Sequence, residues 1–272
     1  MKKKNLFASR KLTVILLCVA LALAACLLWL LLHMDKPEQT SPAPETAQPT
    51  LQPTEAPSTV PPETEATEPT IPQPTEPVVL PELAEDYEKN PDMCGWIQIE
   101  GTQVDYPLMY TPEEPEKYLR MNFDGNYSVG GLPFLDADCS LEPESDNLII
   151  YGHNMLDGSQ FRTIMMYNDE SYWQEHPTIK LSTLYEQREY EVLAAFYDRV
   201  YYKYEECFKF YQFIDAEDEA AFNEAIAYYK EHSEYDTGVT AEYGDRLITL
   251  VTCSYHHDYG RFVVVAREAA GE

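Results

Sequence analysis

An uncharged run of 21 residues, from Leu12 to Leu32, constrains this chain more than any other feature. As a helix it would be ~31 Å long, which matches the hydrocarbon thickness of a bilayer. Five basic residues lie among the first 11, and acidic residues follow the run. The positive-inside rule then predicts a single-pass protein of the cell membrane, with residues 1–11 as a cytoplasmic tail and everything after the run outside the cell.

Two other interpretations of this run are open. A cleaved signal peptide would have a shorter apolar core of ~7–15 residues and a small-residue cleavage site. The segment LAAC at 23–26 resembles a lipobox, which would make Cys26 a lipidated terminus, although the apolar run continues past it. We favour an uncleaved transmembrane anchor over residues 12–32, and all three interpretations place the rest of the chain outside the cytoplasm.

Proline dominates the next part of the chain. Thirteen of the 20 prolines fall within residues 37–81, mixed with Thr, Glu, Gln and Ala. Such a segment has too few large apolar residues to bury a core. It predicts a disordered linker with polyproline character over residues 33–82, either a stalk or a spacer with no length requirement.

The remaining residues, 83–272, are numerous enough for one domain with its own core. They carry 13 basic and 38 acidic residues, and such an acidic surface repels phosphate, so nucleic-acid binding is not expected. Four cysteines lie here without a CxxC pair, which gives no support for a zinc ribbon. We expect Cys94, Cys139 and Cys207 to be buried free thiols.

Short apolar or alternating runs between turn signals predict strands in this part. The clearest span 246–253 and 262–266, which are rich in β-branched residues. The other predicted strands span 95–99, 104–109, 132–135, 147–151, 178–182, 190–197 and 208–213. Helices are predicted over 83–89, around 161–165, and after an N-cap at Asp215, with a stripe of Phe222, Ala225, Ile226 and Tyr229. This pattern predicts a mainly β fold, a closed or nearly closed barrel with a few peripheral helices, and an open α+β sheet is the alternative.

Three residues at the ends of predicted strands could do chemistry. His153 follows an apolar strand and a glycine, Cys253 ends an apolar strand, and Arg261 opens one. If the last two strands form a hairpin, Cys253 and Arg261 are neighbours at its loop end. A guanidinium is a permanent positive charge that favours a thiolate or an oxyanion. A thiol with an ordinary pKa of ~8.5 also needs an imidazole to exchange its proton, and His153 is the candidate.

The pair His256-His257, followed by Asp258, could indicate a metal site. Adjacent histidines usually point apart, and no further set of ligands is evident in the sequence, so no metal is expected.

Three segments carry a family resemblance when taken together: YGHN at 151–154, TLVTC at 249–253 and RFVVVA at 261–266. They resemble the signatures of sortases, the membrane-anchored cysteine transpeptidases of Gram-positive bacteria. Weaker features resemble class B sortases: GWIQI at 95–99, the pair Tyr118-Leu119, FLD at 134–136 and DGS at 157–159.

The resemblance implies an eight-stranded β-barrel with the site at one end. It implies that Cys253 is the nucleophile, His153 the catalytic histidine and Arg261 the arginine that steadies the oxyanion and the substrate. The weaker candidates for substrate contact are Asn154, Thr252, Leu119 and Ser254 through its backbone N–H.

Sortases cleave a sorting signal after its threonine, form a thioester and pass the acyl group to an amine. The resemblance therefore implies secreted substrates with LPxTG-like or NPxTN-like signals, a peptidoglycan precursor or a protein amine as acceptor, and no cofactor. A pilin-polymerising sortase, a cysteine peptidase that releases its substrate to water, and a catalytically weak binding or scaffold domain are the alternatives.

Overall fold

The computed structural model describes residues 77–270. The predicted cytoplasmic tail, the apolar run over 12–32 and the proline-rich segment up to residue 76 lie outside the described residues.

The predicted localisation needs correction. Among residues 77–270, no helix combines the length and the apolar character that crossing a bilayer requires. The longest of them, α4 (Glu219–His232), has 14 residues and would reach only ~21 Å, against a hydrocarbon core of ~30 Å. The prediction of a single-pass protein of the cell membrane with an extracellular catalytic domain is contradicted by this finding.

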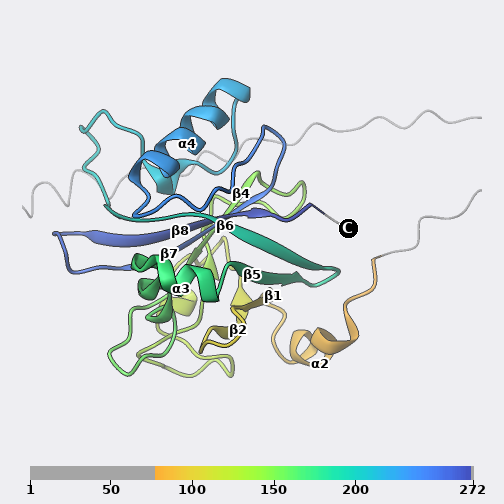
Figure 1. The fold of residues 1–272 in the computed structure, drawn as a ribbon. Helices are drawn as coiled ribbons and strands as arrows, with labels where there is room; N and C mark the ends of the chain where they lie inside the picture. Colours follow the sequence, from red (N-terminus) through yellow and green to blue (C-terminus); the bar gives the residue numbers. More distant parts are fainter. Residues whose placement is uncertain (1–76, 271–272) are drawn as a thin grey trace, which may run out of the picture. The chain divides into compact units, whose positions relative to one another are not determined.

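A closed β-barrel forms the body of the protein (Figure 1). Around the barrel the strands follow the order β1-β2-β3-β4-β7-β8-β6-β5. The strands are β1 (Met93–Gln98), β2 (Asp105–Met109), β3 (Phe134–Leu135), β4 (Asn147–Tyr151), β5 (Thr178–Thr183), β6 (Gln187–Arg199), β7 (Leu247–Cys253) and β8 (Gly260–Glu268). The predicted mainly β fold with a closed barrel is confirmed, and the open sheet is excluded.

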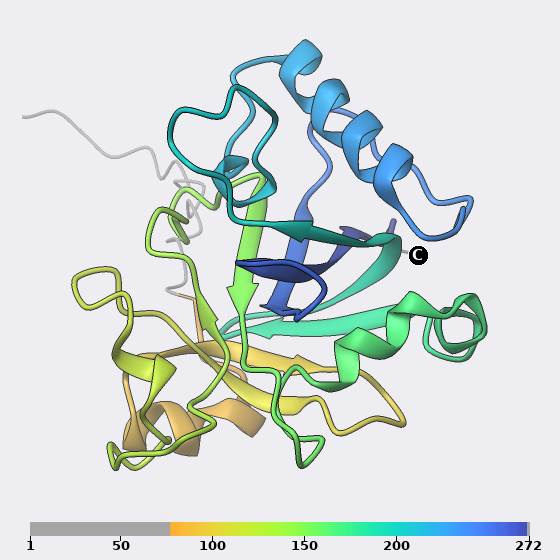
Figure 2. The same ribbon diagram turned by 90° about the vertical axis from the view of Figure 1, so that its left-hand side faces the viewer.

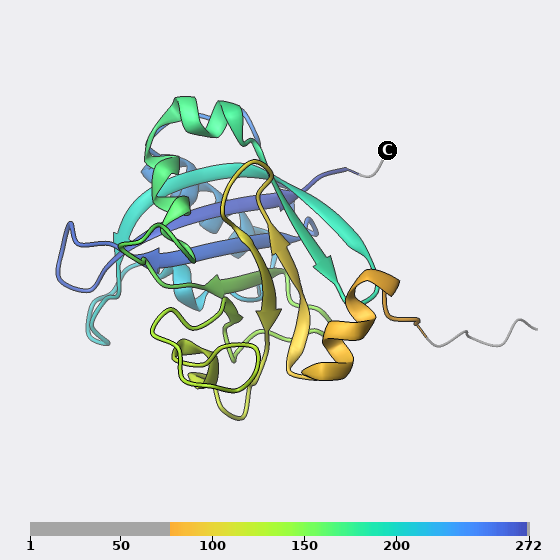
Figure 3. The same cartoon turned by 90° about the horizontal axis from the view of Figure 1, so that it is seen from below.

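The helices are peripheral, as predicted. Helix α4 packs on β6, on the opposite side of the barrel from β1 and β2 (Figure 2). Seen from below, the β1–β2 hairpin crosses the face away from α4, with α2 beside it (Figure 3). Within residues 77–270 the other helices are α2 (Pro81–Lys89), α3 (Glu170–Glu175) and the 3₁₀ helices η1 (Lys117–Leu119), η2 (Thr163–Asn168) and η3 (Phe210–Gln212).

Strands β4, β7 and β8 are buried almost from end to end, which explains their nearly continuous apolar sequences. β4 pairs with β7 in parallel, and β7 pairs with β8 antiparallel. These three adjacent strands therefore place the end of β4, the end of β7 and the start of β8 at one end of the barrel.

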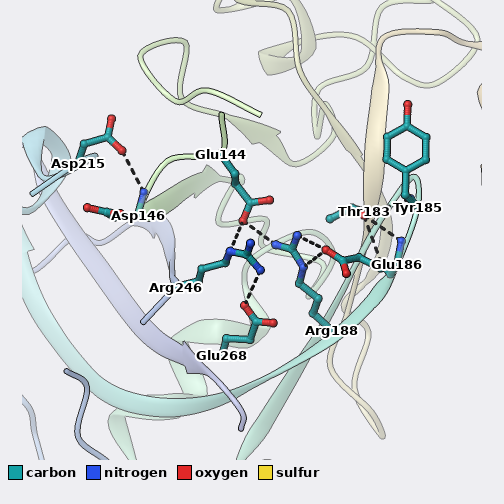
Figure 4. Close-up of polar contacts among 9 residues, drawn as sticks. All are labelled: Glu144, Asp146, Thr183, Tyr185, Glu186, Arg188, Asp215, Arg246 and Glu268. Atoms are coloured by element: carbon teal, nitrogen blue, oxygen red, sulfur yellow. Dashed lines mark hydrogen bonds and ion pairs between the residues drawn. The ribbon is translucent and has the colours of Figure 1, made fainter. Parts of the chain in front are cut away.

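The opposite end of these strands holds a network of ion pairs (Figure 4). Arg188 is only 7% exposed and lies between the carboxylates of Glu144 and Glu186. Arg246 lies 3.5 Å from both Glu144 and Glu268. Carboxylates therefore balance both guanidinium groups at this end.

Two local predictions were wrong. The run 208–213 is not a strand, because its aromatic rings pack on α4: the rings of Phe208 and Tyr228 lie 4.6 Å apart. The N-cap of α4 is Asp218, whose side chain accepts from the N–H of Ala221, whereas Asp215 accepts from the N–H of Asp146. The apolar stripe predicted for this helix is buried, as expected.

The cysteines of the described residues are all free thiols, as expected. Cys139 is buried, Cys94 is half-buried and Cys207 is exposed, so the prediction that all three are buried holds only for Cys139 and is wrong for Cys207.

Candidate active site

The β7–β8 hairpin brings a thiol and a guanidinium together. Cys253, the last residue of β7, is the register partner of Arg261, the second residue of β8. The N–H of Ser254 donates to the carbonyl of Gly260 at 2.9 Å and closes the base of the loop. The predicted hairpin is therefore confirmed.

The parallel neighbour β4 supplies the imidazole. Tyr151 pairs with Val251, and the N–H of Gly152 donates to the Val251 carbonyl at 3.0 Å. The chain then continues beyond the strand to His153. A Cβ at Gly152 would lie 2.4 Å from the ring of Phe161, so only glycine allows this close approach.

One pocket of about 360 Å³ joins the three groups. His153, Cys253 and Arg261 all line it, and all three are half-buried. The structure therefore brings the three residues singled out in the sequence to one end of the barrel.

The hydrogen bond of His153 identifies its tautomer. Its Nε2 lies 2.9 Å from the backbone carbonyl oxygen of Leu119. A carbonyl oxygen only accepts, so Nε2 carries a proton in this bond. In the neutral ring, Nδ1 is then the nitrogen that can take a proton.

The guanidinium of Arg261 has no carboxylate partner among the ion pairs of residues 77–270. Its Nη1 donates to the backbone carbonyls of Gly260 at 3.0 Å and Tyr259 at 3.3 Å. Asp136 lines the same pocket without forming an ion pair with Arg261. The positive charge of Arg261 lies beside Cys253, its register partner, where it can stabilise a negative charge that develops in the pocket.

The weaker candidates divide into two pairs. Leu119 and Thr252 line the pocket, although the Thr252 hydroxyl donates to the Gly152 carbonyl at 2.7 Å. Asn154 and Ser254 are not among the residues that line this pocket.

The polar groups of Asn154 and Ser254 already form hydrogen bonds within the protein. The Asn154 side chain donates to the Cys253 carbonyl at 2.7 Å and accepts from Arg162 at 3.0 Å. The Ser254 N–H is used by Gly260, so it is not free for an oxyanion in this structure. The Asn154 side chain therefore links the segment that follows β4 to the backbone at the end of β7.

Sequence reasoning missed Tyr151 and Asp136 as pocket residues. The Tyr151 hydroxyl donates to an Asp136 oxygen at 2.8 Å. Burial, and then the nearby Asp136 carboxylate, raises the pKa of Tyr151, so this hydroxyl stays protonated at neutral pH. The position of Tyr151 at the end of a strand that leads to His153 was the available signal.

No set of three or more His, Cys, Asp or Glu side chains gathers as a metal site within residues 77–270. His256 instead lies 2.9 Å from the Ser254 hydroxyl, and His257 lies 2.7 Å from the Asp258 carbonyl.

Comparison with known proteins gives consistent matches. A family model described as a sortase domain matches residues 97–269. The chain is 33% identical over 187 residues to sortase B of Listeria monocytogenes, a match that covers 67% of this chain and 72% of the relative. Among solved structures, it is similar to a Staphylococcus aureus sortase B–substrate complex, with a TM-score of 0.63, 26% identity and coverage of 71% of this chain and 86% of that one. It is also similar to a sortase B complexed with triglycine, with a TM-score of 0.63, 26% identity and coverage of 71% and 88%.

Proposed function

The chain belongs to the sortase family as a class B sortase, a transpeptidase, and from this premise we propose the reaction that it performs. It cleaves the C-terminal sorting signal of a secreted protein after threonine, within an LPxTG-like or NPxTN-like motif. It holds the acyl group as a thioester on Cys253 and transfers it to an amine of a cell-wall precursor. Residues 83–272 are the catalytic domain of this proposal.

Acylation begins at Cys253. Its Sγ gives its proton to Nδ1 of His153 and attacks the carbonyl carbon of the substrate threonine. The carbonyl oxygen becomes an oxyanion, which the charge of Arg261 stabilises. The C–N bond then breaks, the leaving amine takes the proton from His153, and the thioester remains.

Deacylation runs the same steps with a new nucleophile. An amine attacks the thioester carbon and gives its proton to His153, and Arg261 again stabilises the oxyanion. The C–S bond breaks, and the Cys253 sulfur recovers its proton. The products are a new amide bond and the free enzyme.

One observation carries this proposal. Cys253 and Arg261 are register partners, and His153 follows the strand that pairs in parallel with β7, so the β7–β8 hairpin and a histidine far from it in sequence line one pocket. A similar sortase B has been solved in complex with triglycine, which supports a glycine peptide as the amine acceptor of this chain as well.

The test incubates the full chain with peptides that carry LPxTG-like or NPxTN-like signals, with and without triglycine. Mass spectrometry should detect a thioester on Cys253 and a peptide ligated to triglycine. Cys253→Ala should form neither product and keep its melting temperature. Cys207→Ala is the matched control, because Cys207 is also a free thiol but lies outside the pocket.

The alternatives give different products. Release of only the free acid when triglycine is present would indicate a hydrolytic cysteine peptidase. Peptide binding without any covalent intermediate in the wild-type protein would indicate a binding or scaffold domain. Either result would overturn the proposal.

A further inference from the structure

The carbonyl that holds His153 comes from a part of the chain without strand pairing. Leu119 is the last residue of η1, a 3₁₀ helix of three residues between β2 and β3. Its carbonyl decides which ring nitrogen of His153 keeps the proton, because a carbonyl accepts only from N–H. A shift of this short helix would release Nε2 and allow the other tautomer.

Burial holds Tyr118, the residue before Leu119, in place. Tyr118 is only 2% exposed, and it packs in a cluster with Leu83, Met93 and Met109. This cluster is separate from the large core of the barrel. The tyrosine therefore anchors η1 to the helix α2 and the strands β1 and β2.

The hydroxyl of Tyr118 joins a partly buried polar cluster. It donates to Asp92 Oδ2 at 2.8 Å and accepts from Asn90 Nδ2 at 2.8 Å. Asn90 is the C-cap of α2, and its side chain also donates to the carbonyl of Phe123 at 2.8 Å. The position of η1 is thus tied to the end of α2.

A second bond ties η1 to Asp92. Lys117 Nζ lies 2.6 Å from the carboxylate of Asp92. The hydrogen bond from Lys117 is the main cause that lowers the pKa of Asp92, so this side chain is a carboxylate at neutral pH. Two consecutive residues, Lys117 and Tyr118, therefore donate to one carboxylate immediately before the Leu119 carbonyl.

Gly131 restrains the segment from another side. Its φ is +56°, and a Cβ there would lie 2.3 Å from the carbonyl oxygen of Tyr118 and 2.6 Å from that of Leu119. The N–H of Leu132 donates to the Tyr118 carbonyl at 3.0 Å. The Leu119 carbonyl is therefore held between this partly buried polar cluster and the closely packed backbone at Gly131.

We propose that Asn90, Asp92, Lys117 and Tyr118 form a positioning group that sets the tautomer of His153 through the Leu119 carbonyl. None of the four touches the imidazole. They act by keeping the carbonyl in line with Nε2–H, so that Nδ1 is the nitrogen left to exchange protons with Cys253. The catalytic consequence rests on the proposed function, whereas the effect on the tautomer does not.

The test replaces the hydroxyl and keeps the ring. In Tyr118→Phe, nitrogen NMR of the full chain at neutral pH should show the His153 ring as a mixture of tautomers, whereas the wild type shows the Nε2–H form. We expect kcat for ligation to fall roughly ten-fold with little change in KM, a part of the ~10²–10⁴-fold that a positioned base contributes. Asp92→Asn should also give a mixture of His153 tautomers and a lower kcat. It replaces Tyr118→Phe in the test if that variant does not fold.

Tyr167→Phe is the matched control. Tyr167 is a fully buried tyrosine whose hydroxyl donates to a backbone carbonyl, that of His176, at 2.8 Å and away from the site. It should lose comparable stability without a change in the His153 tautomer. Wild-type ring nitrogen signals in both Tyr118→Phe and Asp92→Asn, or the same tautomer change in Tyr167→Phe, would overturn the inference.

The proposed function can be disproved independently of this inference. If the wild-type chain forms no thioester with any peptide tested, the kcat comparison cannot be made, but the NMR comparison still decides whether this group sets the tautomer.

Discussion

The two ends of the β4–β7–β8 sheet both carry arginine, and they use it differently. At one end, Arg188 and Arg246 meet the carboxylates of Glu144, Glu186 and Glu268 (Figure 4). At the other end, the guanidinium of Arg261 donates only to backbone carbonyls within residues 77–270. Removing one partner of a buried ion pair destabilises the fold, whereas a guanidinium without an ion-pair partner in a pocket can act on a ligand. Variants at the two ends should therefore separate activity from stability.

The largest effect is expected at the end of the barrel that holds His153, Cys253 and Arg261. In the mechanism that we propose, His153→Ala removes the group that exchanges protons with Cys253, and we expect ligation to fall by about 10⁴-fold, or ~5 kcal/mol, with the fold retained. Ligation kinetics and a thermal melt measure the two properties. His257→Ala, on the exposed loop of the same hairpin, is the control and should keep wild-type turnover. A comparable loss of turnover in both variants would contradict a specific catalytic role for His153.

The next largest effect is expected at the opposite end of the barrel, where a substitution should change stability but not activity. Arg188→Met leaves the part-buried carboxylate of Glu144 without its closest cation. We expect a loss of about 3–5 kcal/mol in the free energy of unfolding, measured with urea, because a broken buried pair leaves a charge in a poorly hydrated site. Turnover per folded molecule should not change. A loss below about 1 kcal/mol, the range of exposed pairs, would mean that this end is not held by its ion pairs.

A smaller effect on activity is expected for Arg261→Lys. The charge stays, but a lysine ammonium lacks the planar donor fork of a guanidinium. We expect kcat/KM to fall by about 10²-fold, a typical cost of losing one oxyanion donor, with an unchanged melting temperature. Arg246→Lys at the other end is the matched control. Full activity of Arg261→Lys would reduce Arg261 to a structural role.

The smallest effect is expected for Arg246→Gln. This side chain is 48% exposed, and its two contacts are at 3.5 Å. Exposed ion pairs of this kind contribute ~0–1 kcal/mol, so we expect a loss of under about 1 kcal/mol and a weaker effect in high salt. A urea titration at two salt concentrations measures this. A loss equal to that of Arg188→Met would contradict the distinction between the buried and exposed arginines.

The sequence predicted the barrel and its hairpin well because the decisive strands are buried on both faces. Continuous apolar runs such as those of β7 and β8 leave few other structures for a segment of that length. The run 208–213 shows the limit of this signal. Its aromatic residues are buried against α4 without any strand pairing, and periodicity alone does not distinguish these cases.

The catalytic candidates were predictable, but their supports were not. His153, Cys253 and Arg261 stand at strand ends, where a short sequence pattern marks them. The partner of His153 is a backbone carbonyl, and every residue has one, so the identity of Leu119 carries no trace of that bond. The N-cap of α4 was predicted wrongly for a related reason. Asp215 and Asp218 are both suitable capping residues, and only the fold decides which of them caps the helix.

The order of the strands has a consequence for the growing polypeptide. Asn154 and Cys253 are 99 residues apart, and β8 follows β7 in the sequence and joins it to β6. During synthesis the thiol emerges from the ribosome before the arginine that faces it. An incomplete chain therefore lacks the arginine that faces Cys253, and the acyl transfer that we propose requires the last strand of the barrel to have docked.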